Sequence, residues 1–284
     1  MSLNTDRHEF DLAYAACSEK TWSFEAGSAR PKIIGWAPNY LIVSSTPIYG
    51  KEISGLLDKV VERDQWSNWQ KTDEPIETMA GWYRGVPVSV FHTGITPVAF
   101  GASYMDFTLE QLRNRTGSRV ILAGEMTSLQ EEVRIGDLVV SGSSVRGDDS
   151  HLSYALPDLA ATAHPFITHQ LVASGRKSGR KTHVGATWSC GIGAGIFDPC
   201  LGDQAWAYHR LGVLGNALDV ATAYLRAPIL GINLSSIWLV ADSLFEPIRW
   251  SSPFTRLGWA DGWKDMVGAS LDALYTLAKE DGSK

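Results

Sequence analysis

Side chains that can transfer protons stand at the ends of several short apolar runs in the sequence. Glu125 follows one such run, Asp242 follows another, and His92 ends a third. Carboxylate and imidazole groups are the commonest general acids and bases in enzymes. Ligands of α/β sheets bind beyond the carboxyl ends of the strands. If the apolar runs are strands of one sheet, their ends predict a shared ligand site.

The elements that would position these residues are strands alternating with segments of helical period. The predicted strands are Tyr40–Ser44, Val86–Thr93, Arg119–Ala123, Asp137–Ser141, Thr182–Trp188 and Ile229–Val240. The predicted helices are Glu52–Arg63, Met105–Arg113, Phe166–Ala173, Gln204–Leu211, Leu218–Arg226 and Met266–Lys279. The segment Phe245–Trp263, rich in Trp, is predicted as a structured loop. This alternation favours an α/β fold with a mainly parallel sheet covered by helices on both faces.

The composition is that of a globular protein, with 44% hydrophobic residues, 20% charged residues and a net charge of -6 over 284 residues. Because no basic tract is present, we expect no nucleic-acid partner. The apolar stretch Ile229–Ala241 is interrupted by polar residues, and the N-terminus lacks a secretion signal, so we expect no membrane partner. Three cysteines without Cys-x-x-Cys spacing predict neither disulfides nor zinc. A cytoplasmic protein with no metal and no cofactor is expected.

Four motifs follow one another in an order that is specific when taken together. They are HTGITP at His92–Pro97, RVILAGEMTSLQEEVRIGDLVV at Arg119–Val140, GVLGNALDVATAY at Gly212–Tyr224 and LVADSL at Leu239–Leu244. From about Leu41 to Leu244 this order resembles the nucleoside phosphorylase family, which includes purine nucleoside and uridine phosphorylases and the hydrolytic methylthioadenosine nucleosidases. The resemblance implies a single-domain, three-layer α/β fold with a twisted, mainly parallel central sheet. We expect that domain over residues 31–280, after an irregular N-terminal segment of residues 1–30.

The resemblance also implies roles for individual residues. Asp242 matches the general acid that protonates the leaving base, and Asp219 matches a carboxylate that binds the ribose hydroxyls. Leu218 takes the position of a methionine beneath the sugar, and we place His92 with these ribose-binding residues as the one imidazole near the inferred site. Each polar residue has a structural alternative: a turn cap for Asp242, an exposed helix start for Asp219, and a hydrogen-bonded structural histidine for His92.

Two aromatic residues are candidates for binding the base. Phe197 resembles the family's stacking aromatic, and Trp188 ends a predicted strand nearby in the chain. Either residue could instead be part of the core. The family resemblance further implies a homo-oligomer, either a dimer or a hexamer, whose sites lie near subunit interfaces.

The departures from the family fall together on the phosphate site. Ser45 stands where the family has a glycine, Tyr49 and Leu122 stand where it has arginines, and Glu125 stands where it has a serine or threonine. Arginine–phosphate contacts are charge-assisted and often bidentate, so two strong contacts are missing. Glu125 would also repel the anion. We therefore interpret these positions as a former phosphate pocket.

A carboxylate at position 125 suits water as the nucleophile. With Glu125 as base and Asp242 as acid, the pair would match the two-carboxylate arrangement of glycoside hydrolysis. The sequence thus predicts an enzyme that cleaves the N-glycosidic bond of a nucleoside or analogue by water. One alternative is a true phosphorylase with a rebuilt phosphate site, using residues such as Arg84. Another is a scaffold that binds or converts a non-nucleoside aromatic molecule. Glu125 could also simply bind the backbone of its own turn.

Overall fold

The computed structural model describes residues 39–44, 55–66, 76–92, 109, 112, 117–147, 155–156, 158–190, 199–217, 220–246 and 253–282. All of these residues belong to the unit Ile33–Lys284. The predicted division into a segment of residues 1–30 and a domain of residues 31–280 lies partly outside the described residues and stays a prediction.

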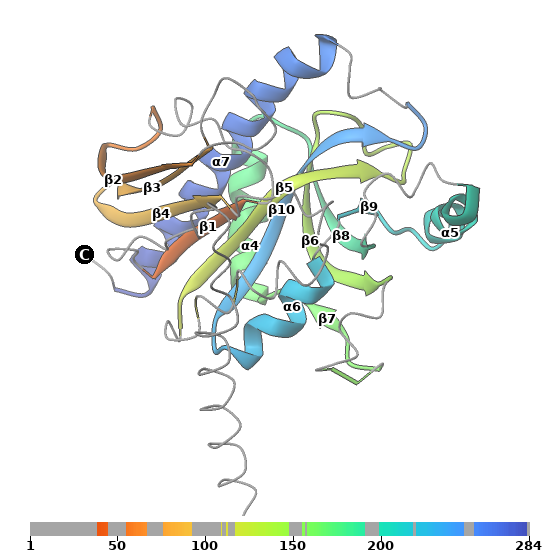
Figure 1. Cartoon of the computed structure of the whole chain (residues 1–284), viewed down its shortest axis with the longest axis horizontal. Helices are drawn as coiled ribbons and strands as arrows, with labels where there is room; N and C mark the ends of the chain where they lie inside the picture. The colour runs from red at the N-terminus through yellow and green to blue at the C-terminus, as the bar shows by residue number, and fades with distance from the viewer. Residues whose placement is uncertain are drawn as a thin grey trace, which may run out of the picture. The chain divides into compact units, whose positions relative to one another are not determined.

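Four parallel strands form the middle of the sheet (Figure 1). Strand β1 (Tyr40–Ser44) lies between β4 (Val86–His92) and β5 (Arg119–Ser128), and β10 (Asn233–Ser243) pairs with the other side of β5. Because these strands are parallel, their carboxyl ends meet at one edge. The sequence rule that places ligands at such an edge therefore applies to these four strands.

The strands outside the middle add antiparallel pairings. Beyond β4, a meander adds β3 (Ile76–Tyr83) and β2 (Lys59–Trp66). Beyond β10 lies antiparallel β6 (Leu138–Arg146), which pairs with β8 (Thr182–Ser189) and with the short β7 (Ala161–Thr162). The two-residue β9 (Gly215–Asn216) then joins β8 back to β5, so β5, β10, β6, β8 and β9 form a closed ring of pairings.

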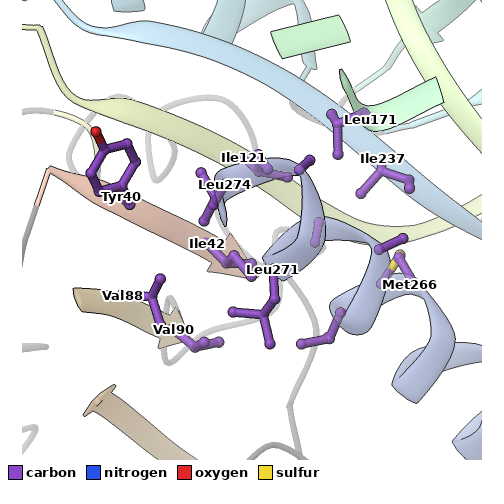
Figure 2. Packing of buried hydrophobic residues seen from close by; sticks show 14 of the residues in the cluster. Tyr40, Ile42, Val88, Val90, Ile121, Leu171, Ile237, Met266, Leu271 and Leu274 are labelled. Atoms are coloured by element: carbon purple, nitrogen blue, oxygen red, sulfur yellow. The ribbon is translucent and has the colours of Figure 1, made fainter. Parts of the chain in front are cut away.

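Helices cover both faces of the sheet. Helices α4 (Pro165–Lys177) and α7 (Pro253–Glu280) share one apolar cluster with Tyr40 and Ile42 of β1, while α6 (Val220–Ile229) shares another with Leu41 and Val43. This alternation follows from the period of two along a strand. Figure 2 shows Ile42, Ile121 and Ile237 of three neighbouring strands facing Leu271 of α7. Helix α5 (Pro199–Arg210) packs on a third cluster near β8. The predicted α/β class, with a sheet covered by helices, is confirmed.

Several predicted elements differ from the structure in their bounds, and three differ most in type or starting residue. Lys59–Trp66 is strand β2, although the adjacent Val60 and Val61 fit a helical pattern, because pairing with β3 decides the conformation of a short apolar run. The predicted loop Phe245–Trp263 instead contains the start of α7 at Pro253, a residue favoured in the first turn of a helix. The predicted strand Ile229–Val240 begins only at Asn233, after the end of α6.

The apolar cluster that α4 and α7 share covers one face of the central strands. Leu271 is fully buried in it, so a Leu271→Ala variant is expected to lower the free energy of unfolding by about 2–5 kcal/mol, through lost burial and the cavity left behind. Urea unfolding followed by circular dichroism measures this loss. Leu211→Ala is the control, because Leu211 is 76% exposed and its truncation is expected to change stability by about 0.5 kcal/mol or less. Equal losses in the two variants would contradict the packing described for α7.

Candidate active site

The register of β5 and β10 places two carboxylates on one face of the sheet. Leu239 pairs with Glu125, and Asp242 pairs with Thr127. Paired residues on neighbouring strands point to the same face, and residues two apart on one strand also share a face. Glu125 and Asp242 therefore lie on the same face, on adjacent strands and two positions apart. Standard strand spacings put their Cα atoms about 8 Å from each other.

A β-bulge in β10 produces this arrangement. Val240 pairs with Met126 and Asp242 pairs with Thr127, so Ala241 is an extra residue in the strand. Without the bulge, Asp242 would oppose Ser128 and would point to the face opposite Glu125. A shift of one residue moves every following side chain to the other face. The bulge therefore turns Asp242 toward Glu125, as bulges beside active sites often re-aim a side chain.

Asp242 is held firmly at the end of β10. Its side chain is buried, with 6% exposure for the residue, and Oδ1 accepts a hydrogen bond of 2.7 Å from the backbone N–H of Ser243. The Oγ of Ser243 in turn accepts the N–H of Phe245 at 3.2 Å. These contacts form the turn cap that was the structural alternative for Asp242. They also fix the direction of its carboxylate, so the cap does not exclude a catalytic role.

The carboxylate of Glu125 is held by helix α7. The indole Nε1 of Trp263 donates a hydrogen bond of 3.1 Å to Glu125 Oε1, and Trp263 itself is 4% exposed. The preceding residue, Gly262, lets the helix approach the sheet here, since a Cβ at that position would lie 2.8 Å from the side chain of Leu239. Leu239 is the register partner of Glu125. The close approach of α7 therefore occurs at the carboxylate.

Sequence reasoning did not identify Trp263. It singled out the Trp-rich segment, but nothing in the local pattern links residue 263 to residue 125. The contact spans 138 residues, and only the packing of α7 across β5 creates it.

Helix α6, which begins just after the predicted ribose-binding residues, is tied to the sheet by buried hydroxyl groups. Tyr224 donates to the carbonyl oxygen of Ser141, and its oxygen lies 2.6 Å from Ser236 Oγ. Burial raises the pKa of Tyr224 to about 12, so this hydroxyl stays protonated and keeps its donor. Trp238 Nε1 also donates to Ser236 Oγ, at 2.9 Å. The network fixes α6 against β10, the strand that presents Asp242.

Two other predicted site residues lie in the core. Leu122 is fully buried in the cluster shared with α6, on the face of β5 opposite Glu125, so the structure does not bring these two residues together. Trp188 is also fully buried and packs against Tyr208, with ring centroids 4.9 Å apart. This is the core placement that was the alternative for Trp188, and a role in binding the base stays a prediction.

His92 is the last residue of β4 and pairs with Ser44 of β1, which puts its backbone at the same edge of the sheet as Asp242. The other predicted residues lie outside the described part of the chain. They are Ser45, Tyr49, Phe197, Leu218 and Asp219. Their roles stay predictions.

Among the described residues there is neither a candidate metal site nor a candidate membrane-spanning helix. No group of three or more His, Cys, Asp or Glu side chains there could hold a metal ion. In that same part of the chain, no helix is both long enough and apolar enough to cross a bilayer.

Comparisons with known proteins agree with the fold described above. The family model of the Phosphorylase superfamily matches residues 40–192. The chain is 26% identical over 259 residues to a uridine phosphorylase of Thermococcus kodakarensis, a match that covers 88% of this chain and 86% of that enzyme. A uridine phosphorylase of Escherichia coli is 30% identical over 151 residues, which is 52% of this chain and 54% of that enzyme. The chain thus spans about half the length of this second relative.

Two further matches extend the comparison. A purine nucleoside phosphorylase of the DeoD type from Streptococcus suis is 24% identical over 196 residues, covering 68% of this chain and 78% of that enzyme. The crystal structure of a uridine phosphorylase from Vibrio fischeri, complexed with 6-hydroxy-1-naphthoic acid, superposes with a TM-score of 0.66 at 19% identity. That match covers 86% of this chain and 92% of the other, and it shows a shared fold.

The family model and the named relatives place this α/β chain among enzymes that cleave N-glycosidic bonds. The chain belongs to the phosphorylase superfamily. Its named relatives are uridine and purine nucleoside phosphorylases, so the predicted family and the predicted class of enzyme are confirmed.

Proposed function

We propose that this enzyme cleaves the N-glycosidic bond of a nucleoside with water as the nucleophile. The observation that carries the proposal is the placement of Glu125 and Asp242 on one face of adjacent strands, two register positions apart. Two carboxylates that project from neighbouring strands toward one face can both reach a sugar bound there, one acting on the leaving base and the other on an attacking water molecule.

Glu125 is suited to the role of general base. Its carboxylate would remove a proton from the attacking water as the bond to the sugar forms, and its charge would stabilise the oxocarbenium character of the transition state. The same charge opposes phosphate: two unit charges about 4 Å apart repel by roughly 1 kcal/mol in water and about 4 kcal/mol at an effective dielectric of 20. Both effects favour water over phosphate.

Asp242 is suited to the role of general acid. As the glycosidic C–N bond breaks, its electron pair moves onto the base, and protonation by Asp242 neutralises the charge that develops there. The buried position and the fixed carboxylate described above support this role, because a proton donor is effective only within hydrogen-bonding reach of the leaving group.

Trp263 is a positioning residue for Glu125, and this role can be tested. A Trp263→Phe variant keeps most of the buried ring but loses the N–H donor, so kcat is expected to fall about tenfold while KM stays within about twofold. Steady-state kinetics of base release measure both constants. Trp82→Phe on β3 is the control, because β1 and β4 lie between β3 and β5 in the sheet. A variant that loses thermal stability but keeps its kcat would show that Trp263 serves packing alone.

Phosphorolysis is the second candidate, since the relatives named above are phosphorylases. It requires basic residues to replace the missing arginines. Arg84 of the same subunit does not supply such a residue. It lies in the turn between β3 and β4, at the edge of the sheet where the parallel strands begin. Its Nη1 also forms an ion pair with Asp272 Oδ1 at 2.9 Å. The site proposed above lies at the edge where those strands end.

The deciding experiment follows free base by chromatography after purified enzyme is incubated with purine and pyrimidine nucleosides, with and without phosphate. Base release without phosphate supports the proposal. Release that requires phosphate would favour a phosphorylase with a rebuilt anion site. If no base is released under either condition, the proposal fails, and the scaffold acts on a substrate outside the nucleosides.

The proposal includes a cytoplasmic enzyme that assembles as a homo-oligomer, either a dimer or a hexamer. The three sparse cysteines, which lack Cys-x-x-Cys spacing, support the first part. Light scattering of the purified chain gives its oligomeric state directly.

A further inference from the structure

Asn216 is a buried amide whose side-chain nitrogen has no hydrogen-bond partner. The residue is 3% exposed, and its Nδ2 neither donates to protein nor reaches solvent. Buried amide nitrogens in folded proteins nearly always donate a hydrogen bond. An unpartnered donor of this kind is a natural partner for an acceptor carried by a ligand.

The backbone around Asn216 is held from both sides. Asn216 pairs with Thr127 of β5 and with Trp188 of β8, and the N–H of Ala217 donates to the Trp188 carbonyl oxygen at 2.9 Å. At Gly215, a Cβ would overlap Met126 Cε and come within 2.5 Å of the Thr127 carbonyl oxygen. Strand β9 therefore lies as close to β5 as a glycine permits. The backbone that carries the Asn216 side chain is therefore fixed in place before any ligand arrives.

The same register places Asn216 in line with Asp242. Asn216 pairs with Thr127, and Thr127 pairs with Asp242, so the three residues form one row across β9, β5 and β10. Residues paired in this way share a face. Two strand spacings separate the ends of the row, so the Cα atoms of Asn216 and Asp242 lie about 10 Å from each other. The unpartnered donor and the proposed acid thus flank Thr127 on the face of Glu125.

A second unpartnered donor, Trp188 Nε1, lies one strand farther from Asp242 and is covered by the backbone of Gly147. A Cβ at Gly147 would overlap that nitrogen, so the backbone of Gly147 lies directly against it. Asn216 pairs directly with Thr127, the residue that separates it from Asp242, so it is the nearer of the two donors to the proposed acid.

We propose that Asn216 Nδ2 donates a hydrogen bond to a ring carbonyl oxygen of the base, which makes nucleosides of oxo-bases the preferred substrate class. This inference rests on the proposed function. When the C–N bond breaks, its electron pair delocalises over the base and onto that oxygen, while Asp242 supplies the proton to a ring nitrogen. A fixed donor stabilises the charge on the oxygen as it develops. A base with an amino group in the same place would present its own N–H donors to the N–H donor of Asn216, so this hydrogen bond could not form.

The test compares matched oxo and amino substrates in the enzyme and in an Asn216→Asp variant. The pairs are inosine with adenosine and uridine with cytidine, and the quantity measured is the ratio of kcat/KM for oxo over amino. We expect the unsubstituted enzyme to favour the oxo member. The carboxylate introduced by the substitution would accept rather than donate, so the ratio is expected to fall by about 100-fold or more. The ratio does not depend on the fraction of the variant that is folded.

Asn233→Asp is the matched control, since Asn233 begins β10 at the opposite edge of the sheet. Its ratio is expected to stay within about twofold of the unsubstituted value. An Asn216→Asp ratio equal to that of the control would overturn the inference, as would an unsubstituted enzyme that favours amino bases.

A binding measurement tests the role of Asn216 whether water or phosphate is the nucleophile of the reaction. Calorimetric binding of the free bases hypoxanthine and adenine is compared in the enzyme and in Asn216→Asp. If base release requires phosphate, the hydrolytic proposal fails while both comparisons still test Asn216. If no nucleoside is cleaved, the calorimetry alone decides: loss of hypoxanthine preference in the variant supports the inference, and unchanged preference or no binding of either base overturns it.

Discussion

Glu125→Gln is expected to abolish the phosphate-independent release of base, with kcat about 10²–10⁴-fold below that of the unsubstituted enzyme. The amide keeps the size of the side chain and can still accept the hydrogen bond from Trp263 Nε1. It cannot take a proton from water, and it carries no charge to stabilise an oxocarbenium ion. The loss therefore reports on proton transfer and charge rather than on packing. Discontinuous chromatography of free base in phosphate-free buffer gives the rate.

Glu132→Gln provides the matched control, because Glu132 is exposed in the turn after β5. Its rate is expected to equal that of the unsubstituted enzyme within error, and circular dichroism checks that both variants are folded. If Glu125→Gln cleaves nucleosides at the unsubstituted rate without phosphate, Glu125 is not the base. If the variant instead gains release that depends on phosphate, the carboxylate acts mainly by excluding the anion.

Asp242→Asn is expected to reduce cleavage of natural nucleosides about 10²–10⁴-fold, because the leaving base then departs without a proton donor. The effect depends on the leaving group. A riboside of nitrophenol leaves as a stable anion and needs little protonation, so the same variant is expected to cleave it within about tenfold of the unsubstituted rate. This difference between substrates separates the loss of an acid from a general loss of structure.

Asp203→Asn serves as the control for the second variant, since Asp203 is exposed on α5. Its rates with both substrates are expected to match those of the unsubstituted enzyme. Equal losses on nucleoside and nitrophenyl riboside in Asp242→Asn would assign the residue to binding or to folding. In that case the turn formed by Asp242 Oδ1 and the Ser243 N–H would be its main role.

The parts of the fold that could be predicted from sequence are those decided by local pattern. Strand β1 has the predicted bounds, Tyr40–Ser44, because a run of buried β-branched and aliphatic residues has few alternatives. The start of β4 at Val86 follows from the same signal. The parallel order of these strands then puts Glu125 and Asp242 near one edge, which is the part of the site that sequence reasoning reached.

The parts that could not be predicted depend on contacts between distant segments. The bulge at Ala241 decides which face Asp242 occupies, and a bulge in a buried apolar strand leaves no mark in its hydrophobic pattern. The hydrogen bond from Trp263 to Glu125 depends on α7 lying against the sheet at Gly262, where it approaches Leu239 of β10. The unpartnered amide of Asn216 requires the closed ring of strands, since β9 is only two residues long.

The packing of α7 on the first strands of the sheet also bears on how the chain is made. Tyr40 of β1 donates to Asp281, 241 residues later, and Glu125 meets Trp263 across 138 residues. Contacts of such long range slow folding, and a growing chain emerges from the ribosome with its N-terminal part first. Until α7 has emerged, Ile42, Ile121 and Ile237 lack the helix that covers them in the folded protein. The helix that holds the proposed base in place is thus also the segment whose late arrival leaves the nascent sheet open to aggregation and to chaperones.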